Sequence, residues 1–123
     1  MNINFETERP IYLELSDWIE DNILSNVFME ETQIPSTTEL SVNFKINPAT
    51  ALKGINILVD QGIIYKKRGV GMFVCEGAAN KVRANRKQEF YNAYINSLLT
   101  EASKLNISKE EIIEMIERGF DNE

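Results

Sequence analysis

Two helix-start signals stand close together in the middle of the chain, and their spacing restricts the fold more than any other feature. Ser36 and Glu39 form a capping box, in which each side chain accepts a hydrogen bond from the other residue's backbone N–H. Asn47-Pro48 is a second start, because Asn is a good N-cap and Pro fits the first helical position. The helix that begins at Ser36 must therefore be short. Together the two signals predict two helices joined by a tight link.

We expect a helix before this pair and a β-hairpin after it. Arg9-Pro10 opens the first helix, whose apolar residues recur at helical spacing up to Ile23. Thr32 to Pro35 is expected to be a link. Residues 63–67 and 72–75 are β-prone runs around Gly69 and Gly71, a pattern typical of a hairpin. The helix that begins at Asn47 ends near Gly62, and its predicted buried stripe comprises Ala51, Leu52, Ile55, Leu58 and Val59.

The C-terminal part of the chain predicts two further helices. One spans residues 79 to about 105, and Ser108 with Glu111 forms a second capping box that starts the other, which Gly119 ends. Neither helix can bury its apolar face alone, so we expect both to pack against each other and a second copy of the chain. A small-molecule pocket is the alternative use of the aromatic residues here. The predicted interface comprises Tyr91, Tyr94, Ile95, Leu98, Leu99, Ile112 and Ile116.

The order of these elements defines the expected fold class. Helix, short helix, tight link, helix and hairpin is the order of a winged helix-turn-helix. The prediction is therefore a mainly α fold with a small β-hairpin. Residues 1–75 are expected to form the winged helix-turn-helix domain, and residues 76–123 a C-terminal two-helix region for dimerisation or effector binding.

Charge is distributed unevenly along the chain. The net charge of −6 argues against a nucleic-acid partner only if it is spread evenly. Residues 1–44 hold one basic and nine acidic residues, and residues 88–123 hold three basic and eight acidic residues. Residues 45–87, in contrast, hold nine basic and two acidic residues. A local positive patch attracts a polyanion at short range whatever the total charge, so the middle of the chain is compatible with DNA binding.

Composition excludes several other classes of function. The chain has no His and one Cys, which removes the commonest general base and any zinc site built from clustered thiolates. No nucleophile–base pair and no metal-ligand spacing is present, so we expect neither an enzyme nor a bound metal or cofactor. No apolar run approaches the roughly 18 residues that span a membrane, and the N-terminus has no signal-peptide pattern. The expected location is cytoplasmic.

The predicted fold assigns residues to a DNA-binding surface. The second helix of a helix-turn-helix lies in the major groove and presents its N-terminal residues to base edges. The N-terminus of the preceding helix offers free N–H groups to a phosphate, and a basic wing with a Gly-x-Gly tip can enter the minor groove. The candidate DNA-binding residues from this argument are Ser36, Asn47, Ala49, Thr50, Lys53, Lys66, Lys67, Arg68, Gly69, Val70 and Gly71.

The stretch from Pro10 to Val74 resembles the DNA-binding domain of the GntR family of bacterial transcription regulators. The matching motifs are Pro10-Ile11-Tyr12, then Ile34-Pro35-Ser36 with Glu39-Leu40, then Ile46-Asn47-Pro48 with Thr50. The wing from Gly62 to Val74 is similar to the family pattern Gly-Leu-Ile, four variable residues, Gly-x-Gly-x-Phe-Val. The Asn-Pro pair and the short C-terminal region are similar to the small YtrA-type subgroup.

This resemblance implies a homodimeric regulator, usually a repressor, that binds an inverted-repeat operator, often of an ABC-transporter operon. It also adds Thr38 to the candidate DNA-binding residues, which then number twelve. The chain departs from the family pattern at one DNA-facing position, where the family often has an Arg that contacts DNA and this chain has Thr38. It also departs within the stripe expected to be buried, where Ala51, Leu52 and Ile55 stand in place of the family's usual Val, an often polar residue and an aromatic residue. An alternative function follows from Thr38 and the acidic balance: a winged-helix module that binds a protein partner or a small-molecule effector without binding DNA.

Overall fold

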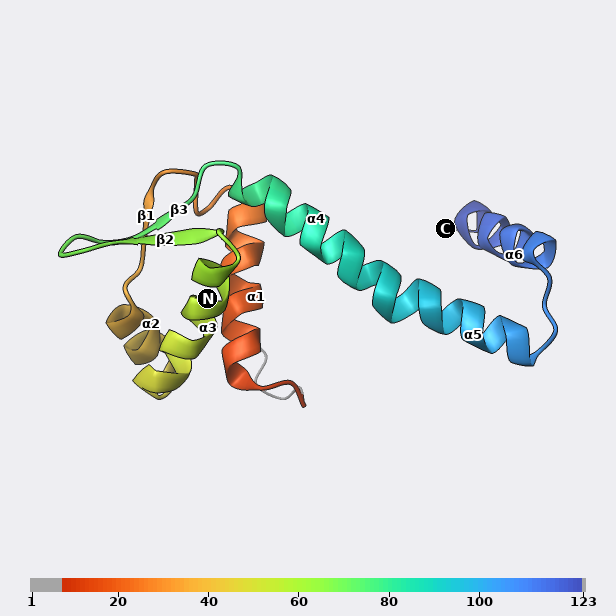
Figure 1. Cartoon of the computed structure of the whole chain (residues 1–123), viewed down its shortest axis with the longest axis horizontal. Helices are drawn as coiled ribbons and strands as arrows, with labels where there is room; N and C mark the ends of the chain where they lie inside the picture. Colours follow the sequence, from red (N-terminus) through yellow and green to blue (C-terminus); the bar gives the residue numbers. More distant parts are fainter. Residues whose placement is uncertain (1–7, 123) are drawn as a thin grey trace. The chain divides into compact units, whose positions relative to one another are not determined.

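The computed structural model describes residues 8–122, and the chain divides into two compact units, residues 1–84 and 85–123. The N-terminal segment, where the sequence has no signal-peptide pattern, lies largely outside the described residues. The first unit contains α1 (Ile11–Leu24), β1 (Gln33–Ile34), α2 (Thr37–Phe44), α3 (Pro48–Asp60), β2 (Ile64–Lys67) and β3 (Gly71–Val74) (Figure 1). The boundary falls within α4 (Ala78–Phe90), after which follow the π-helical η1 (Tyr91–Ile95), α5 (Asn96–Lys104) and α6 (Lys109–Asp121).

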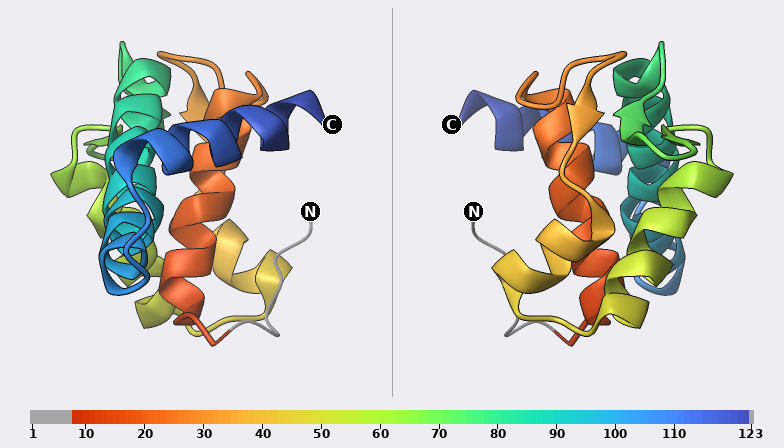
Figure 2. Two further views of the ribbon diagram at one scale, coloured as in Figure 1. Left: turned by 90° about the vertical axis from the view of Figure 1, so that its right-hand side faces the viewer. Right: turned by 90° about the vertical axis from the view of Figure 1, so that its left-hand side faces the viewer.

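The core of the first unit is built on α1. Leu15, Ile19 and Ile23 recur every fourth residue, so they share one helix face, and all three are buried. This face packs against α3, and α3 in turn packs against α2 (Figure 2). The Trp18 ring meets the Phe44 ring of α2 edge to face, with the centroids 5.0 Å apart. The three helices therefore enclose one apolar core.

The two adjacent helix-start signals act as predicted. The N–H of Glu39 donates to Ser36 Oγ at 3.1 Å, and the N–H of Ser36 donates to Glu39 Oε1 at 3.2 Å, which completes the capping box. Asn47 Oδ1 accepts from the N–H of Ala49 at 2.7 Å, and α3 begins at the residue after Asn47, Pro48. A left-handed residue, Lys45 with φ of 54°, separates the helices. The tight link between α2 and α3 is confirmed.

The sheet has three strands, one more than the predicted hairpin. The strands are antiparallel in the order β1-β3-β2, and β1 pairs Gln33 with Phe73 and Ile34 with Met72. The interpretation of residues 32–35 as a mere link was therefore wrong. A strand of two residues has no periodicity to detect, and its pairing depends on the free edge of β3, which lies far away in the sequence.

The start of α4 belongs to the core of the first unit. Ala78, Ala79 and Val82 are buried within the same apolar cluster as α1 and the strands. The backbone N–H of Gly77 also donates to the Glu30 side chain. The packed first unit consequently extends to residue 84, beyond the end of the hairpin at residue 75.

The second unit is helical, with two differences from the sequence prediction. Residues 91–95 adopt a π-helix between α4 and α5, where the apolar pattern predicted a regular helix. Ser108 starts α6 by accepting from the N–H of Glu111 at 3.1 Å, but α6 continues through Gly119 to Asp121. Gly119 lies inside an exposed helix and does not end it, because Gly disfavours a helix by only about 1 kcal/mol.

Candidate nucleic-acid interface

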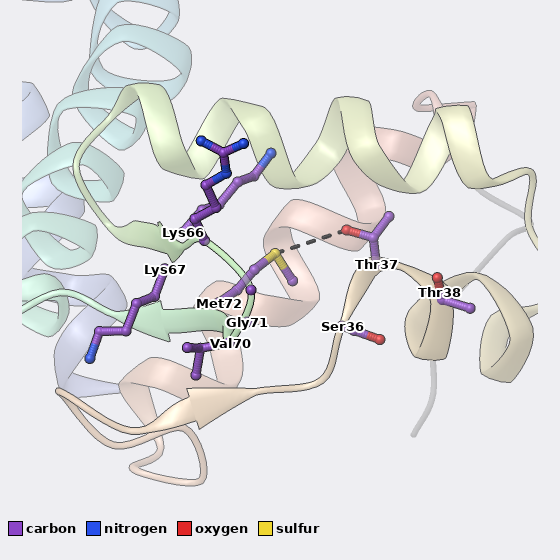
Figure 3. A pocket seen from close by; sticks show the side chains of 10 residues that line it. Ser36, Thr37, Thr38, Lys66, Lys67, Val70, Gly71 and Met72 are labelled. Atoms are coloured by element: carbon purple, nitrogen blue, oxygen red, sulfur yellow. Dashed lines mark hydrogen bonds between the residues drawn. The ribbon is translucent and has the colours of Figure 1, made fainter.

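The N-terminus of α2 and the wing border a common hollow of about 430 Å³ (Figure 3). The wing is the hairpin of β2, β3 and the connecting residues 68–70. Helix α2 and its cap supply Ser36, Thr37 and Thr38 to the hollow, and the wing supplies the rest. The lining residues from the wing are Lys66, Lys67, Arg68, Gly69, Val70, Gly71 and Met72. Eight of the twelve predicted DNA-binding residues thus lie around one concavity, although the two segments are distant in sequence.

The α2 end of this hollow can receive an anion. The first N–H groups of a helix have no intrahelical acceptor, and the aligned peptide dipoles make this end positive. The Ser36 side chain caps the helix, and the Thr37 hydroxyl points across the hollow to the Met72 sulfur at 3.9 Å (Figure 3). Thr38 is exposed beside them. The exposed first turn and the cationic wing together make the concavity electropositive.

The two wing lysines lie on opposite faces of the sheet (Figure 3). Lys66 extends toward α3, where its Nζ donates to Asn56 Oδ1 at 2.8 Å. Lys67 extends the other way, and its Nζ lies 4.9 Å from the centroid of the Phe73 ring, in a cation–π contact. Successive side chains of a strand alternate between faces, so the two lysines extend to opposite sides of the sheet although both border the hollow. Of the two, Lys66 is the one that links the wing to α3.

Gln33 holds the wing tip, a role that no pattern in the sequence indicates. Its Nε2 donates to the carbonyl of Val70 at 3.0 Å. Gly71 has a φ of +147°, and a Cβ there would lie 2.3 Å from Gln33 Nε2. The Gly-x-Gly spacing indicates an unusual backbone at the tip. Gln33, which holds this tip, gives no signal near the two glycines, because it lies in another part of the sequence.

The outer face of α3 contains polar side chains that bind within the protein. Asn47 caps the helix, Asn56 accepts from Lys66, and Lys53 Nζ lies 4.1 Å above the centroid of the Tyr12 ring. Thr50 is half-buried and Ala49 is exposed. These contacts hold the side chains of two predicted DNA-binding residues, Asn47 and Lys53, against the protein.

Leu52 corrects the predicted buried stripe of α3. It is 40% exposed, whereas Ala51, Ile55 and Leu58 are buried. One residue turns a helix by about 100°, so the face that packs on α1 excludes the neighbour of Ala51. Leu52 lines a hollow of about 400 Å³ along α3 together with Ala49, Lys53, Asn56, Ile57 and Asp60.

Two groups with shifted pKa values lie elsewhere on the first unit. The Tyr65 hydroxyl donates to Glu31 at 3.0 Å, and this hydrogen bond raises the pKa of Tyr65 above its usual value. Burial raises the pKa of the Cys75 thiol, which disfavours the reactive thiolate. Within residues 8–122, no cluster of three acidic, Cys or His side chains could hold a metal, and no helix has the length and apolarity to cross a bilayer.

The predicted dimer residues present apolar side chains on the surface of the second unit. Tyr91, Tyr94, Leu99 and Ile116 are exposed in the single chain, with Tyr94 at 65%. Ile95, Leu98 and Ile112 are half-buried. Exposed large apolar groups on neighbouring helix turns are unusual for a monomer and are typical of an interaction surface.

Comparison with known proteins identifies the family. The sequence profile of the bacterial regulatory proteins of the gntR family matches residues 11–74, which contain α1, the helix-turn-helix and the wing. The chain belongs to the GntR family. Its members are DNA-binding transcription regulators and not enzymes. The resemblance inferred from the motifs is confirmed.

Two curated relatives match nearly the whole chain. The transcriptional regulator YhcF of Bacillus subtilis is 26% identical over 116 residues, 94% of this GntR-family chain and 94% of the relative. The transcriptional repressor YtrA of the same organism is 24% identical over 116 residues, 94% of this chain and 88% of the relative. The similarity to the small YtrA-type proteins therefore includes the C-terminal helices.

Solved structures confirm the fold class. A GntR-family regulator from Bacteroides thetaiotaomicron has a TM-score of 0.78 and 35% identity, covering 91% of this chain and 97% of that one. The DNA-binding domain of AraR in complex with operator ORX1 has a TM-score of 0.54 and 29% identity, covering 61% of this chain and 90% of that one. A winged helix-turn-helix followed by a C-terminal helical region is the architecture shared with the first of these.

Proposed function

We propose that this GntR-family regulator is a homodimeric repressor that binds an inverted-repeat operator. The observation that carries the proposal is the electropositive concavity shared by the first turn of α2 and the wing. Duplex DNA has the complementary charge along both strands. The AraR DNA-binding domain, a structural neighbour, is bound to an operator, and this supports the same class of ligand here.

Each element has a distinct contact in the proposed complex. Helix α3 enters the major groove with Asn47, Ala49 and Thr50 near its N-terminus. The first turn of α2 receives a backbone phosphate at its N–H groups. The wing tip, with Arg68 and its two glycines, enters the adjacent minor groove. Phosphate contacts then supply affinity, and the α3 contacts supply sequence discrimination.

The C-terminal region, residues 76–123, supplies the dimer in this proposal. A two-fold axis through the exposed apolar side chains of α5 and α6 would bury them and repeat the DNA-binding surface once per subunit. Two recognition helices of such a dimer contact half-sites about 34 Å apart on one side of the duplex, which requires an inverted repeat. The similarity to YtrA-type proteins supports an operon of ABC-transporter genes as the target.

A salt titration on the DNA upstream of the protein's own gene tests DNA binding. Affinity should fall steeply and linearly with the logarithm of salt concentration, because bound lysines and arginines release counterions. Arg68→Ala should weaken binding to all sequences and reduce the magnitude of this slope by about one, whereas Thr50→Ala should also change base preference. Lys109→Ala, at the start of α6, is the control that removes a charge outside the proposed surface.

The expected protection pattern is symmetric, and the centres of its two half-sites lie about one helical turn apart. Failure to protect any DNA even at low salt would contradict the proposal. Recovery of a stable protein partner in its place would favour the other function that the sequence leaves open, a winged-helix module for protein interaction.

A further inference from the structure

The centre of the outer face of α3 is apolar, and this limits what it can recognise. Ala49 and Leu52 are three residues apart, so they lie on the same side of the helix, and both are exposed. They line the hollow of about 400 Å³ that extends along α3. We propose that Leu52, supported by Ala49, reads the C5-methyl group of thymine in the major groove. This inference rests on the proposed function, since it specifies which base the operator-binding helix selects.

The polar atoms around Leu52 bind within the protein. Lys53 Nζ lies over the Tyr12 ring at 4.1 Å, Asn56 Oδ1 accepts from Lys66 at 2.8 Å, and Asn47 Oδ1 accepts from the N–H of Ala49 at 2.7 Å. A base edge that approaches the middle of the face therefore meets aliphatic carbon first. Polar readout by the side-chain oxygen of Asn47 or Asn56 would require these hydrogen bonds to break.

Thymine supplies a matching group. Its C5-methyl is the one apolar group that the four bases present in the major groove, and aliphatic side chains contact it directly. Burying a methyl against Leu52 requires no hydrogen-bond partner on the protein. A cytosine at the same place lacks the methyl group, and a purine would put its N7 acceptor against the Leu52 side chain without satisfying it.

Charge complementarity favours DNA over a protein as the occupant of this face. Lys53 lines the α3 hollow, Lys66 reaches Asn56 beside it, and Arg68 lies in the wing hollow that Lys66 also lines. Asp60 is the one acidic residue that lines the α3 hollow, and it stands at the C-terminal end of the helix. The apolar strip of Ala49 and Leu52 would lie against the base edges on the floor of the major groove, and the cationic side chains beside it would lie near the phosphates at the edges of the groove.

Replacement of thymine by deoxyuridine tests the inference, because it removes the methyl and leaves every hydrogen-bonding group of the base in place. A duplex is first selected from a random pool with the wild-type protein. Each thymine of a half-site is then replaced singly. We expect one or two positions at which affinity falls about fourfold, the value of one buried methyl, and no effect elsewhere.

Leu52 variants assign the effect to this side chain. Leu52→Ala should bind the thymine and deoxyuridine duplexes equally, whereas Leu52→Met, which keeps an apolar chain of similar volume, should retain the preference. Val27→Ala is the matched control, since Val27 is an exposed apolar residue outside α2, α3 and the wing. Unfolding curves of each variant check that a loss of binding does not come from a loss of folding.

Two results would overturn the inference while leaving the proposed function intact. One is a selected duplex that no deoxyuridine replacement weakens. The other is a Leu52→Ala protein that still prefers thymine by the wild-type factor. If no duplex is enriched at all, the proposed function fails and the inference fails with it. The replacement series with the wild-type protein can still overturn the inference even if Leu52→Ala does not fold.

Discussion

Asn47 combines a structural role with a place on the proposed DNA-binding surface. Its Oδ1 accepts from the N–H of Ala49 at 2.7 Å, which satisfies one of the free donors at the start of α3. The Nδ2 group of the same side chain is a donor suited to a base or a phosphate. A substitution here therefore changes stability even in the absence of DNA, and only the difference between the two effects reports on recognition.

Asn47→Ala should lower the free energy of unfolding by about 1 kcal/mol, because the cap of α3 is lost. Asn47→Ser should cost much less, since a Ser hydroxyl also caps a helix. Denaturant unfolding monitored by circular dichroism measures both. Equal stability of the Ala and wild-type proteins would show that the cap contributes nothing in solution.

Individual residues differ in how well local sequence predicts their environment. Ser36, Asn47 and Ser108 were identified correctly as helix caps, because a cap depends on residues within one turn. The roles of Gln33 and Leu52 were not predicted correctly. The partner of Gln33 lies on the wing, and the exposure of Leu52 depends on how α3 packs against α1, so neither could be read from neighbouring residues.

Among the elements, the close crossing of α1 and α3 decides how the recognition helix is presented. Ser16 Oγ donates to the carbonyl of Gly54 at 2.6 Å across the two helices. A Cβ at Gly54 would lie 2.6 Å from the carbonyl oxygen of Tyr12. Only a residue without a side chain allows this approach, so the orientation of α3 depends on Gly54.

Gly54→Ala should destabilise the protein by about 1–2 kcal/mol. The clash of the added Cβ with the backbone of α1 destabilises the protein more than the higher helix propensity of Ala stabilises it. Gly119→Ala is the matched control. It also replaces a helical glycine, but a Cβ there meets no atom within 4 Å, so α6 should become slightly more stable. Thermal unfolding of both variants measures the contrast, and a Gly54→Ala protein as stable as Gly119→Ala would refute it.

The elements that the sequence failed to predict share a physical cause. The strand β1 exists because β3 has an edge to pair, and the π-helix at residues 91–95 occurs within a stretch whose apolar spacing is helical. Hydrophobic periodicity reports which face is buried. It does not report strand pairing between distant segments. It also does not distinguish a π-helical turn, which has one more residue per hydrogen-bonded ring, from an α-helical turn.

For the whole molecule, the apolar surface of the second unit is the main feature that a single chain leaves unexplained. Tyr94, Leu99 and Ile116 are all at least 44% exposed. Leu99 is outside the hollow between α5 and α6, which the neighbouring Leu98 and Ile112 line. It is therefore the residue best suited to test dimerisation without disturbing the packing of the unit itself.

Leu99→Glu should weaken self-association by about a hundred- to ten-thousandfold, because a two-fold dimer loses the burial of two Leu side chains. Operator affinity should fall with it, because two linked half-site contacts become independent. Gln61→Glu, an exposed change of the same charge in the first unit, is the control. Sedimentation equilibrium measures the dissociation constant, and an unchanged value for Leu99→Glu would contradict the predicted interface.

Helix order, the caps of α2 and α3 and the basic middle segment followed from the sequence alone, because each depends on residues close together in the chain. They were sufficient to indicate a winged helix-turn-helix, and the family followed from the motifs between Pro10 and Val74 that resemble it. Only the tertiary structure decided which side chains face outward from α3, that Lys66 binds Asn56 of α3 and how Gln33 supports the wing tip. Those properties depend on contacts between distant segments, and no local pattern encodes them.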